Sequence, residues 1–119
     1  MAVRSPNPTA NERSKLMYSV VFLVKKKADM TQEEFASYWI NEHTPLTAQV
    51  DGVRAYRCFP FHAGQDGPFD AIAFISFDDR ASADRAFASP AFERALADAA
   101  NFQTVDQTLS FTADEHIVV

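Results

Sequence analysis

Residues Thr31–Leu46 read TQEEFASYWINEHTPL and decide which fold this chain can adopt. Thr31 followed by Glu34 is a capping box, in which the hydroxyl accepts from the Glu34 amide and the carboxylate accepts from the Thr31 amide. A helix is therefore expected to begin at about Gln32. Its broad, mostly apolar side, which is expected to face a sheet, is formed by residues three and four apart: Phe35, Tyr38, Trp39, Glu42, His43 and Leu46.

The end of this helix presents a histidine. Pro45 disfavours helical geometry at Thr44, so the regular helix is expected to end or kink just beyond His43. The imidazole then has two interpretations. It either caps the negative end of the helix dipole or bonds a free carbonyl, or it serves as a proton donor, proton acceptor or ligand anchor at the edge of a pocket.

The composition describes one globular domain that carries an excess of apolar side chains. A chain of 119 residues allows a single domain that buries about two-thirds of its unfolded surface. Its 47% hydrophobic content, with 11 phenylalanines, suits a well-filled core, and the 13% aromatic share indicates more apolar surface than one small core needs, which a ligand cavity or an oligomer interface would absorb. The net charge of -5, without a basic stripe beyond residues 25–27, argues against nucleic acid as a partner.

Other sequence signals bear on compartment and cofactors. Cys58 is the only cysteine, so neither an internal disulfide nor a multi-cysteine metal site is expected. Residues 1–15 lack the apolar core of a signal peptide and are expected to form a flexible N-terminal arm. No apolar run reaches membrane length, so a cytoplasmic protein with no membrane partner is the default expectation.

Four runs rich in β-branched and aromatic residues predict four strands, at residues 16–24, 52–61, 69–78 and 103–112. The first and third runs are apolar on both faces. In the fourth, Val105, Leu109 and Phe111 are expected to face the core. The polar, glycine-containing segment 62–68 is expected to be a flexible loop.

The order of predicted elements points to one architecture. Helical patterns at residues 82–88 and 90–100 complete a series of strand, helix, strand, strand, helix, strand, which is the βαββαβ order of ferredoxin-like domains. Right-handed crossovers place both helical layers on one face of a four-stranded antiparallel sheet. A second copy would cover the other, apolar face and leave a cavity between the layers of each subunit, so a homodimer joined through its sheet faces is expected.

Several ordered segments resemble the EthD family, named for ethyl tert-butyl ether degradation, within the dimeric α/β-barrel superfamily. The resemblance covers residues 17–119 and rests on VVFLVKKKADMTQEEFASYWINEHTPL, Gly52–Tyr56, Phe69–Ala73 leading to Phe77–Asp79, Ser89–Pro90 and Asp114–Val119. It implies an α+β domain at residues 16–119 that forms a dimeric α/β barrel. The superfamily includes cofactor-independent monooxygenases, lactone isomerases, cyclases and haem binders, so the resemblance does not select a reaction.

Two residues are candidate catalytic groups. His43 matches the histidine of the family's Trp-x-x-x-His-x-Pro-Leu motif. Asp70 lies on an apolar strand face, where an unpaired carboxylate is costly. It is expected either to pair with Arg54, Arg57 or a backbone donor, or to form an acid/base pair with His43 at the mouth of a cavity.

Four further residues are candidates for substrate binding. Trp39 serves either as core or as a ligand platform. Tyr18 and Tyr56 either are simply packed or donate hydroxyls into an apolar cavity. His116, which matches the family's terminal Glu-His, either joins the Asp70 cluster or lies on the surface beside the fourth strand.

Two functional hypotheses follow. The first is a binding or accessory protein for a small apolar or aromatic compound, in oxidative degradation or secondary metabolism as the family name implies. The second is a cofactor-independent enzyme with His43 as acid/base: an oxidoreductase (monooxygenase) on a phenolic or quinol-like substrate, or a lactone isomerase. No second histidine stands at metal-ligand spacing from His43, and no nucleotide motif is present, so no cofactor is expected, with haem a lesser possibility.

Overall fold

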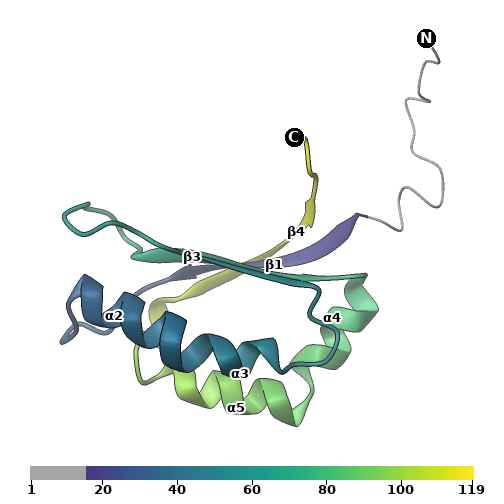
Figure 1. Ribbon diagram of the computed structural model, residues 1–119, viewed down its shortest axis with the longest axis horizontal. Helices are drawn as coiled ribbons and strands as arrows, with labels where there is room; N and C mark the ends of the chain where they lie inside the picture. Colours follow the sequence, from purple (N-terminus) through teal and green to yellow (C-terminus); the bar gives the residue numbers. More distant parts are fainter. Residues whose placement is uncertain (1–15) are drawn as a thin grey trace.

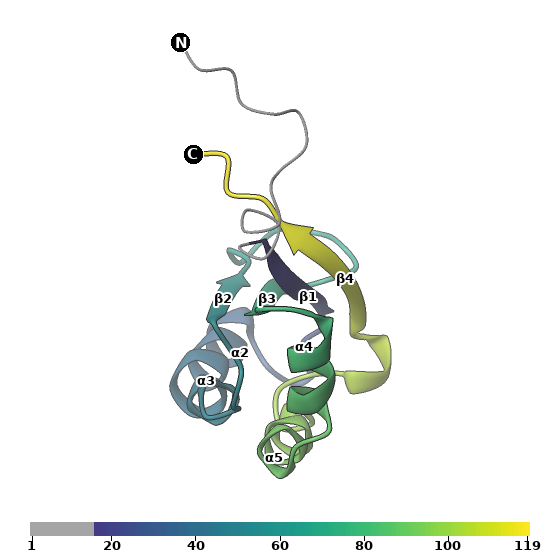
Figure 2. The same ribbon diagram turned by 90° about the vertical axis from the view of Figure 1, so that its right-hand side faces the viewer.

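Four antiparallel strands and a layer of helices on one side of them make up the computed structural model, which describes residues 16–119 (Figures 1 and 2). The expected N-terminal arm, residues 1–15, lies outside the described residues. The elements in chain order are β1 (Met17–Val24), α2 (Gln32–Tyr38), the π-helix η1 (Trp39–His43), α3 (Thr44–Ala48), β2 (Ala55–Pro60), β3 (Ala71–Phe77), α4 (Arg80–Phe87), α5 (Pro90–Ala99), the 3-10 helix η2 (Val105–Gln107) and β4 (Leu109–Glu115).

The sheet has the strand order β2-β3-β1-β4, with every neighbouring pair antiparallel. Val20 in the centre of β1 lies opposite Ile75 of β3 and Thr112 of β4. Together with the helical crossovers this is the ferredoxin-like α+β fold, so the fold class expected from the sequence is confirmed.

One face of the sheet packs against the helices and forms the core. Val20 and Val24 of β1 are buried there, as are the alternate residues of β3 from Ala71 to Phe77. The facing helices contribute Phe35, Trp39 and other buried side chains. Alternation along each strand therefore assigns these residues to the helical side. The sequence predicted apolar residues on both faces of β1 and β3 without distinguishing the helical face.

The other face of the sheet, called here the open face, is covered by no helix of residues 16–119 (Figure 2). It is largely apolar apart from a hydrogen-bonded cluster of Ser19, Arg57, Ser76 and Glu115. Its apolar residues oppose one another across the strands: Val21, Leu23, Phe59, Ile72, Phe74, Leu109 and Phe111. Three of them are about half exposed, with Phe59 at 48%, Leu109 at 46% and Phe111 at 54%. A chain of this size rarely leaves so much contiguous apolar surface in water.

The prediction that Leu109 and Phe111 face the core is wrong. The expected strand over residues 103–112 is interrupted by η2, and β4 begins only at Leu109. Leu109 and Phe111 then pair with Leu23 and Val21 on the open face. The alternating pattern identified an amphipathic strand correctly, but the apolar side of that strand belongs to the open face rather than to the core.

The first helix begins as its capping box predicts, with the Glu34 amide 3.1 Å from the Thr31 hydroxyl and the Thr31 amide 2.9 Å from the Glu34 carboxylate. The regular helix was expected to end or kink just beyond His43. The α-helix instead gives way to the π turn η1 already at Trp39, and the chain stays helical through α3 to Ala48, so the expected end is wrong.

The π turn is what accommodates the proline. The Thr44 amide bonds the Trp39 carbonyl, five residues back, so the backbone is wider than in an α-helix where Pro45 enters. Pro45 has no N–H to offer, and the Thr44 hydroxyl donates instead to the Ile40 carbonyl at 2.7 Å. A search of residues 16–119 finds no helix long and apolar enough to cross a bilayer.

Candidate functional site

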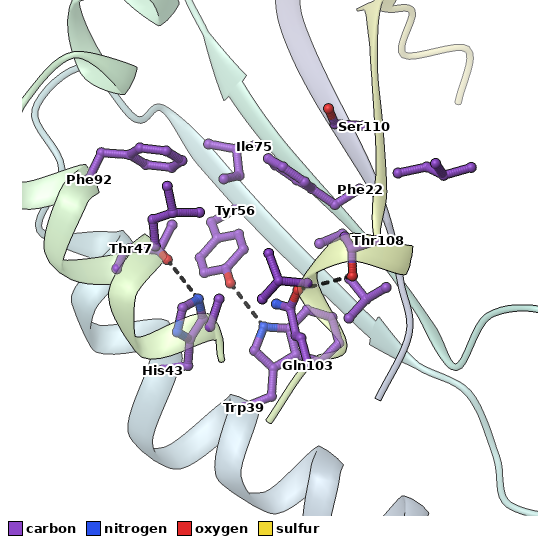
Figure 3. Close-up of a pocket in the computed structure, with 17 residues that line it drawn as sticks. Phe22, Trp39, His43, Thr47, Tyr56, Ile75, Phe92, Gln103, Thr108 and Ser110 are labelled. Carbon is purple, nitrogen blue, oxygen red and sulfur yellow. Dashed lines mark hydrogen bonds between the residues drawn. The ribbon is translucent and has the colours of Figure 1, made fainter. Parts of the chain in front are cut away.

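A cavity of about 200 Å³ lies between the sheet and the helices that include η1 and α5 (Figure 3). Its wall is mainly apolar, with Phe22, Ala73 and Ile75 from the sheet and Phe92, Ala95 and Ala99 from α5. Six polar side chains also line it: His43, Thr47, Tyr56, Gln103, Thr108 and Ser110. No aspartate, glutamate, lysine or arginine is among the lining residues, so the cavity wall bears no permanent charge.

The π turn supplies two of the lining side chains. Trp39 opens η1 and His43 closes it, and they are buried with 1% and 7% of their surface exposed. Phe102, which is fully buried, packs against both rings, at centroid distances of 6.4 Å from Trp39 and 4.7 Å from His43. Single π turns inside α-helices are frequent at functional sites.

His43 is hydrogen-bonded to a carboxylate from another helix. Its Nδ1 lies 2.9 Å from Oδ2 of Asp98, in the last turn of α5. Both side chains are largely buried, at 8% and 16% exposure. This contact joins the first helical segment to the last one beside the cavity.

Asp98 accepts two further hydrogen bonds. The Tyr38 hydroxyl donates to its Oδ1 at 2.7 Å, and the side-chain amide of Asn101 donates to the same oxygen at 3.0 Å. Burial raises the pKa of the Asp98 carboxyl, but the hydrogen bonds from Tyr38, His43 and Asn101 outweigh burial and leave the pKa below its ordinary value. Asp98 is therefore ionised at neutral pH.

His43 is neutral at the same pH. Burial lowers the pKa of the imidazole, and the hydrogen bond and charge of Asp98 offset this only in part, so the net shift is downward. A neutral ring that gives its Nδ1 proton to Asp98 keeps a lone pair on Nε2. The Thr47 hydroxyl on the cavity wall lies 3.4 Å from Nε2 and donates a hydrogen bond to this lone pair (Figure 3). The site therefore presents an oriented base to the cavity.

A second polar contact connects the helix to the sheet inside the cavity. The Trp39 indole donates to the Tyr56 hydroxyl at 3.0 Å (Figure 3). Burial raises the pKa of Tyr56, so its phenol stays protonated at physiological pH. Trp39 belongs to the core cluster, which was one of its two expected roles, and its ring also lines the cavity.

The structure brings three of the six sequence-predicted site residues to one cavity: Trp39, His43 and Tyr56. The other three are not among its lining residues. Tyr18 packs against the core cluster around Val20 and Phe77. His116 follows β4 and is exposed.

The expected pairing of Asp70 with His43 is wrong. The Asp70 carboxylate accepts from the Lys26 amide at 2.9 Å and lies 3.7 Å from the Lys25 ammonium. Its position just before β3 places it against the end of β1, so the alternative of a backbone donor is the one observed. Arg54 and Arg57, the other expected partners, pair with Asp78 and Glu115.

Sequence reasoning missed Asp98 and four polar residues that line the cavity, namely Thr47, Gln103, Thr108 and Ser110. For Asp98 a signal existed, because a carboxylate in the last turn of a helix opposes the helix dipole and so indicates a specific partner. Thr47 lies four residues after His43, on the same helical side once the helix is known to continue. Gln103 carries no comparable signal in the sequence.

The fold and the cavity define a class of protein, a ferredoxin-like domain with an uncharged cavity between its sheet and its helices. Within residues 16–119 no group of three histidine, cysteine, aspartate or glutamate side chains is placed to hold a metal ion. The sequence matches the family model of the EthD domain over residues 27–106, more than half of the chain. The chain belongs to the EthD domain family.

Similar proteins agree with this assignment. An uncharacterized 11.0 kDa protein from the thcB-thcC intergenic region of Rhodococcus erythropolis is 30% identical over 105 residues, which cover 86% of this chain and 99% of that protein. An EthD family protein from Bacillus halodurans has a TM-score of 0.69 at 20% identity, over 84% of this chain and 99% of that one.

A dimeric ferredoxin-like protein of unknown function from Thermobifida fusca has a TM-score of 0.62 at 14% identity, over 86% of this chain and 92% of that one. At these identities the two solved structures establish the fold and not the chemistry. The Rhodococcus erythropolis protein is similar to this chain over 99% of its own length, so the two proteins share the whole domain.

Proposed function

We propose that this protein binds a small, uncharged organic molecule in the cavity between its sheet and its helices. The observation that carries the proposal is the cavity wall, which encloses about 200 Å³ with apolar and aromatic side chains and without a charged one. An apolar cavity of about 150 Å³ is known to bind benzene. The space here therefore suits a compound with one ring and a few substituents, as the hypothesis of an aromatic ligand requires.

A binding screen tests this function. Phenols, quinones and lactones with one ring are expected to raise the melting temperature, whereas benzoate, which carries a charge into an uncharged cavity, is not. Ala95 lines the cavity on α5, and Ala97 on the same helix is exposed. Ala95→Leu is expected to abolish ligand stabilisation, while Ala97→Leu keeps it. Native mass spectrometry of the protein as purified would show a ligand that copurifies, and failure of every compound to bind contradicts the proposal.

The His43–Asp98 contact favours a second candidate function, that of a cofactor-independent enzyme. A neutral imidazole whose Nδ1 is held by a carboxylate and whose Nε2 faces a cavity has the arrangement of a general base. Its substrate would be an activated carbon acid or a phenol, in a monooxygenase or an isomerase reaction. Turnover without added metal or cofactor, reduced about 100-fold to 10,000-fold in His43→Gln, would establish it. A His43→Gln variant with full activity and full affinity leaves His43 only a structural role.

We also propose that the protein is a homodimer joined through the open face. This face is apolar across all four strands, and a ferredoxin-like relative is described as dimeric. Burying it against a second copy removes exposed phenylalanine and leucine side chains from water, which is favourable by roughly 25 cal/mol per Å². Light scattering at low micromolar concentration should give twice the mass of the chain, and a folded monomer there contradicts the proposal.

The family name suggests a place for such a protein in the oxidative degradation of small organic compounds or in secondary metabolism. We propose this setting from the EthD family assignment alone.

A further inference from the structure

Gln103 contributes a second polar group to the cavity wall. The backbone at this residue is held on both sides, because the Gln103 amide donates to the Ala99 carbonyl at 2.8 Å and the residue forms an isolated antiparallel bridge with Lys26. The adjacent Thr104 amide donates to the Lys25 carbonyl at 2.8 Å. These main-chain contacts do not depend on the Gln103 side chain, whose position at the cavity is thereby fixed.

The carboxamide of Gln103 is also oriented. The Thr108 hydroxyl accepts from the Lys25 amide at 3.3 Å, and its proton lies between two acceptors, Gln103 Oε1 at 3.2 Å and the Thr104 carbonyl at 3.3 Å. With the oxygen of the carboxamide directed to Thr108, its nitrogen is directed toward the interior of the cavity (Figure 3). A carboxamide nitrogen offers two N–H donors and no acceptor.

Two polar groups of the cavity therefore differ in what they offer. His43 Nε2 is an acceptor, since its neutral ring gives the Nδ1 proton to Asp98, and the Thr47 hydroxyl is its partner in the free protein. Gln103, from the segment between α5 and β4, presents a donor. A ligand that takes the place of the Thr47 hydroxyl at His43 and also accepts from Gln103 needs both a hydrogen-bond donor and an acceptor oxygen.

We infer that Gln103 is a ligand-binding residue that donates a hydrogen bond to a carbonyl oxygen, and that the ligand is a neutral one-ring compound carrying a carbonyl and a separate hydroxyl group. The hydroxyl donates to His43 Nε2. This inference rests on the proposed binding function and gives it a substrate class. A carboxylate in place of the carbonyl is excluded from the class, because the cavity wall has no cation to offset its desolvation.

Matched pairs of ligands test the role of Gln103. The three hydroxyacetophenones carry a hydroxyl and a carbonyl on one ring, and the ethylphenol of the same substitution has a similar shape without the carbonyl. For the isomer that fits, we expect the wild-type protein to prefer the hydroxyacetophenone by about 3-fold to 10-fold in Kd, the worth of one hydrogen bond. Gln103→Met, which keeps the length of the side chain and removes its donors, should lose or reverse this preference and still bind ethylphenol.

Two further variants complete the experiment. Gln65→Met changes a glutamine in the exposed loop before β3 and should leave every affinity unchanged. Thr108→Val removes the hydroxyl that orients the carboxamide and should lower the preference for the carbonyl compound without abolishing it. Melting temperatures in the absence of ligand show that each variant is folded.

The outcomes separate the inference from the function on which it rests. If ring compounds bind but the ratio of the two affinities is the same in the wild type and in Gln103→Met for all three isomers, the role of Gln103 is wrong and the binding function stands. If neither series binds the wild-type protein, the binding function itself is overturned. Binding of hydroxybenzoates as tightly as of hydroxyacetophenones overturns the assignment of a neutral substrate class.

Discussion

His43 Nδ1 lies 2.9 Å from Asp98 Oδ2, so a histidine at the end of the π turn and an aspartate in the last turn of α5 fix each other beside the cavity. Asp98 is itself held by Tyr38 and Asn101. The ring therefore has one favoured tautomer, with its proton on Nδ1 and its lone pair on Nε2. This relationship makes the chemistry of the cavity testable without knowledge of the ligand.

Asp98→Asn should disturb the tautomer and the stability together. The variant keeps the size of the side chain but loses the charge, and its amide group competes as a donor, so the preference for a proton on Nδ1 weakens. We expect a loss of about 1 to 3 kcal/mol in the free energy of unfolding. Nitrogen chemical shifts of the His43 ring report the tautomer directly, and Asp29→Asn, at an exposed turn, is the control. An unchanged ring spectrum in Asp98→Asn would show that Asp98 does not set the tautomer.

The lowered pKa of His43 should make folding sensitive to mild acid. The ordinary pKa is 6.5, and burial lowers it in the folded state, so the unfolded chain binds the proton first as the pH falls. Stability is therefore full above about pH 7 and declines below pH 6.5 until the folded pKa is passed, by at most about 1.4 kcal/mol per pH unit for this one proton. The pKa of Asp98, lowered from 3.8, acts in the same direction only at lower pH.

Denaturant unfolding of the wild type and of His43→Gln at several values between pH 7.5 and pH 5 measures this effect. The difference between the two curves removes the contributions of the exposed histidines, His62 and His116. The difference in the free energy of unfolding between the wild type and His43→Gln should narrow as the pH falls. Parallel curves over this range would mean that His43 has the same proton affinity in the folded and unfolded chain.

Local signals in the sequence predicted the fold because they act over short distances. The capping box located the helix start at Gln32, and runs of β-branched and aromatic residues located β1 and β3. The π turn was missed because it depends on a compensation, in which the Thr44 hydroxyl replaces the N–H that Pro45 lacks. Pro45 alone indicates only that the regular α-helical hydrogen-bond pattern must change near His43.

The candidate site was predictable only where one element carries it. Trp39 and His43 lie four residues apart and follow from helical spacing. The partner of His43 comes from a helix 55 residues later, and no pattern in the chain encodes that distance. Asp70 was a plausible partner because its carboxylate lies in an apolar run of sequence. In the structure this carboxylate accepts from the Lys26 amide just before β3 and does not contact His43.

The proposed dimer predicts that a charge on the open face separates the subunits. Phe111→Asp places a carboxylate on that face, in the edge strand β4, where desolvation against a second copy is costly. We expect a monomer by light scattering at low micromolar concentration. Ile40→Asp is the matched control, since Ile40 is similarly exposed at 44% but lies on η1, away from the open face. If both variants stay dimeric, the subunits meet elsewhere.

Tyr56→Phe should change the environment and the fluorescence of Trp39, the only tryptophan in the chain. The substitution removes the acceptor of the indole N–H, which is bonded at 3.0 Å in a residue that is 1% exposed, and an unpaired buried donor costs about 1 to 3 kcal/mol. We therefore expect lower stability and a blue shift of the tryptophan emission.

A ligand oxygen that reaches the freed N–H would restore part of the loss, so ligand stabilisation should be larger in Tyr56→Phe than in the wild type. Tyr18→Phe, at a tyrosine that does not line the cavity, should change neither the emission nor the ligand effect. Equal behaviour of the two variants would show that the Trp39–Tyr56 contact contributes nothing to the site.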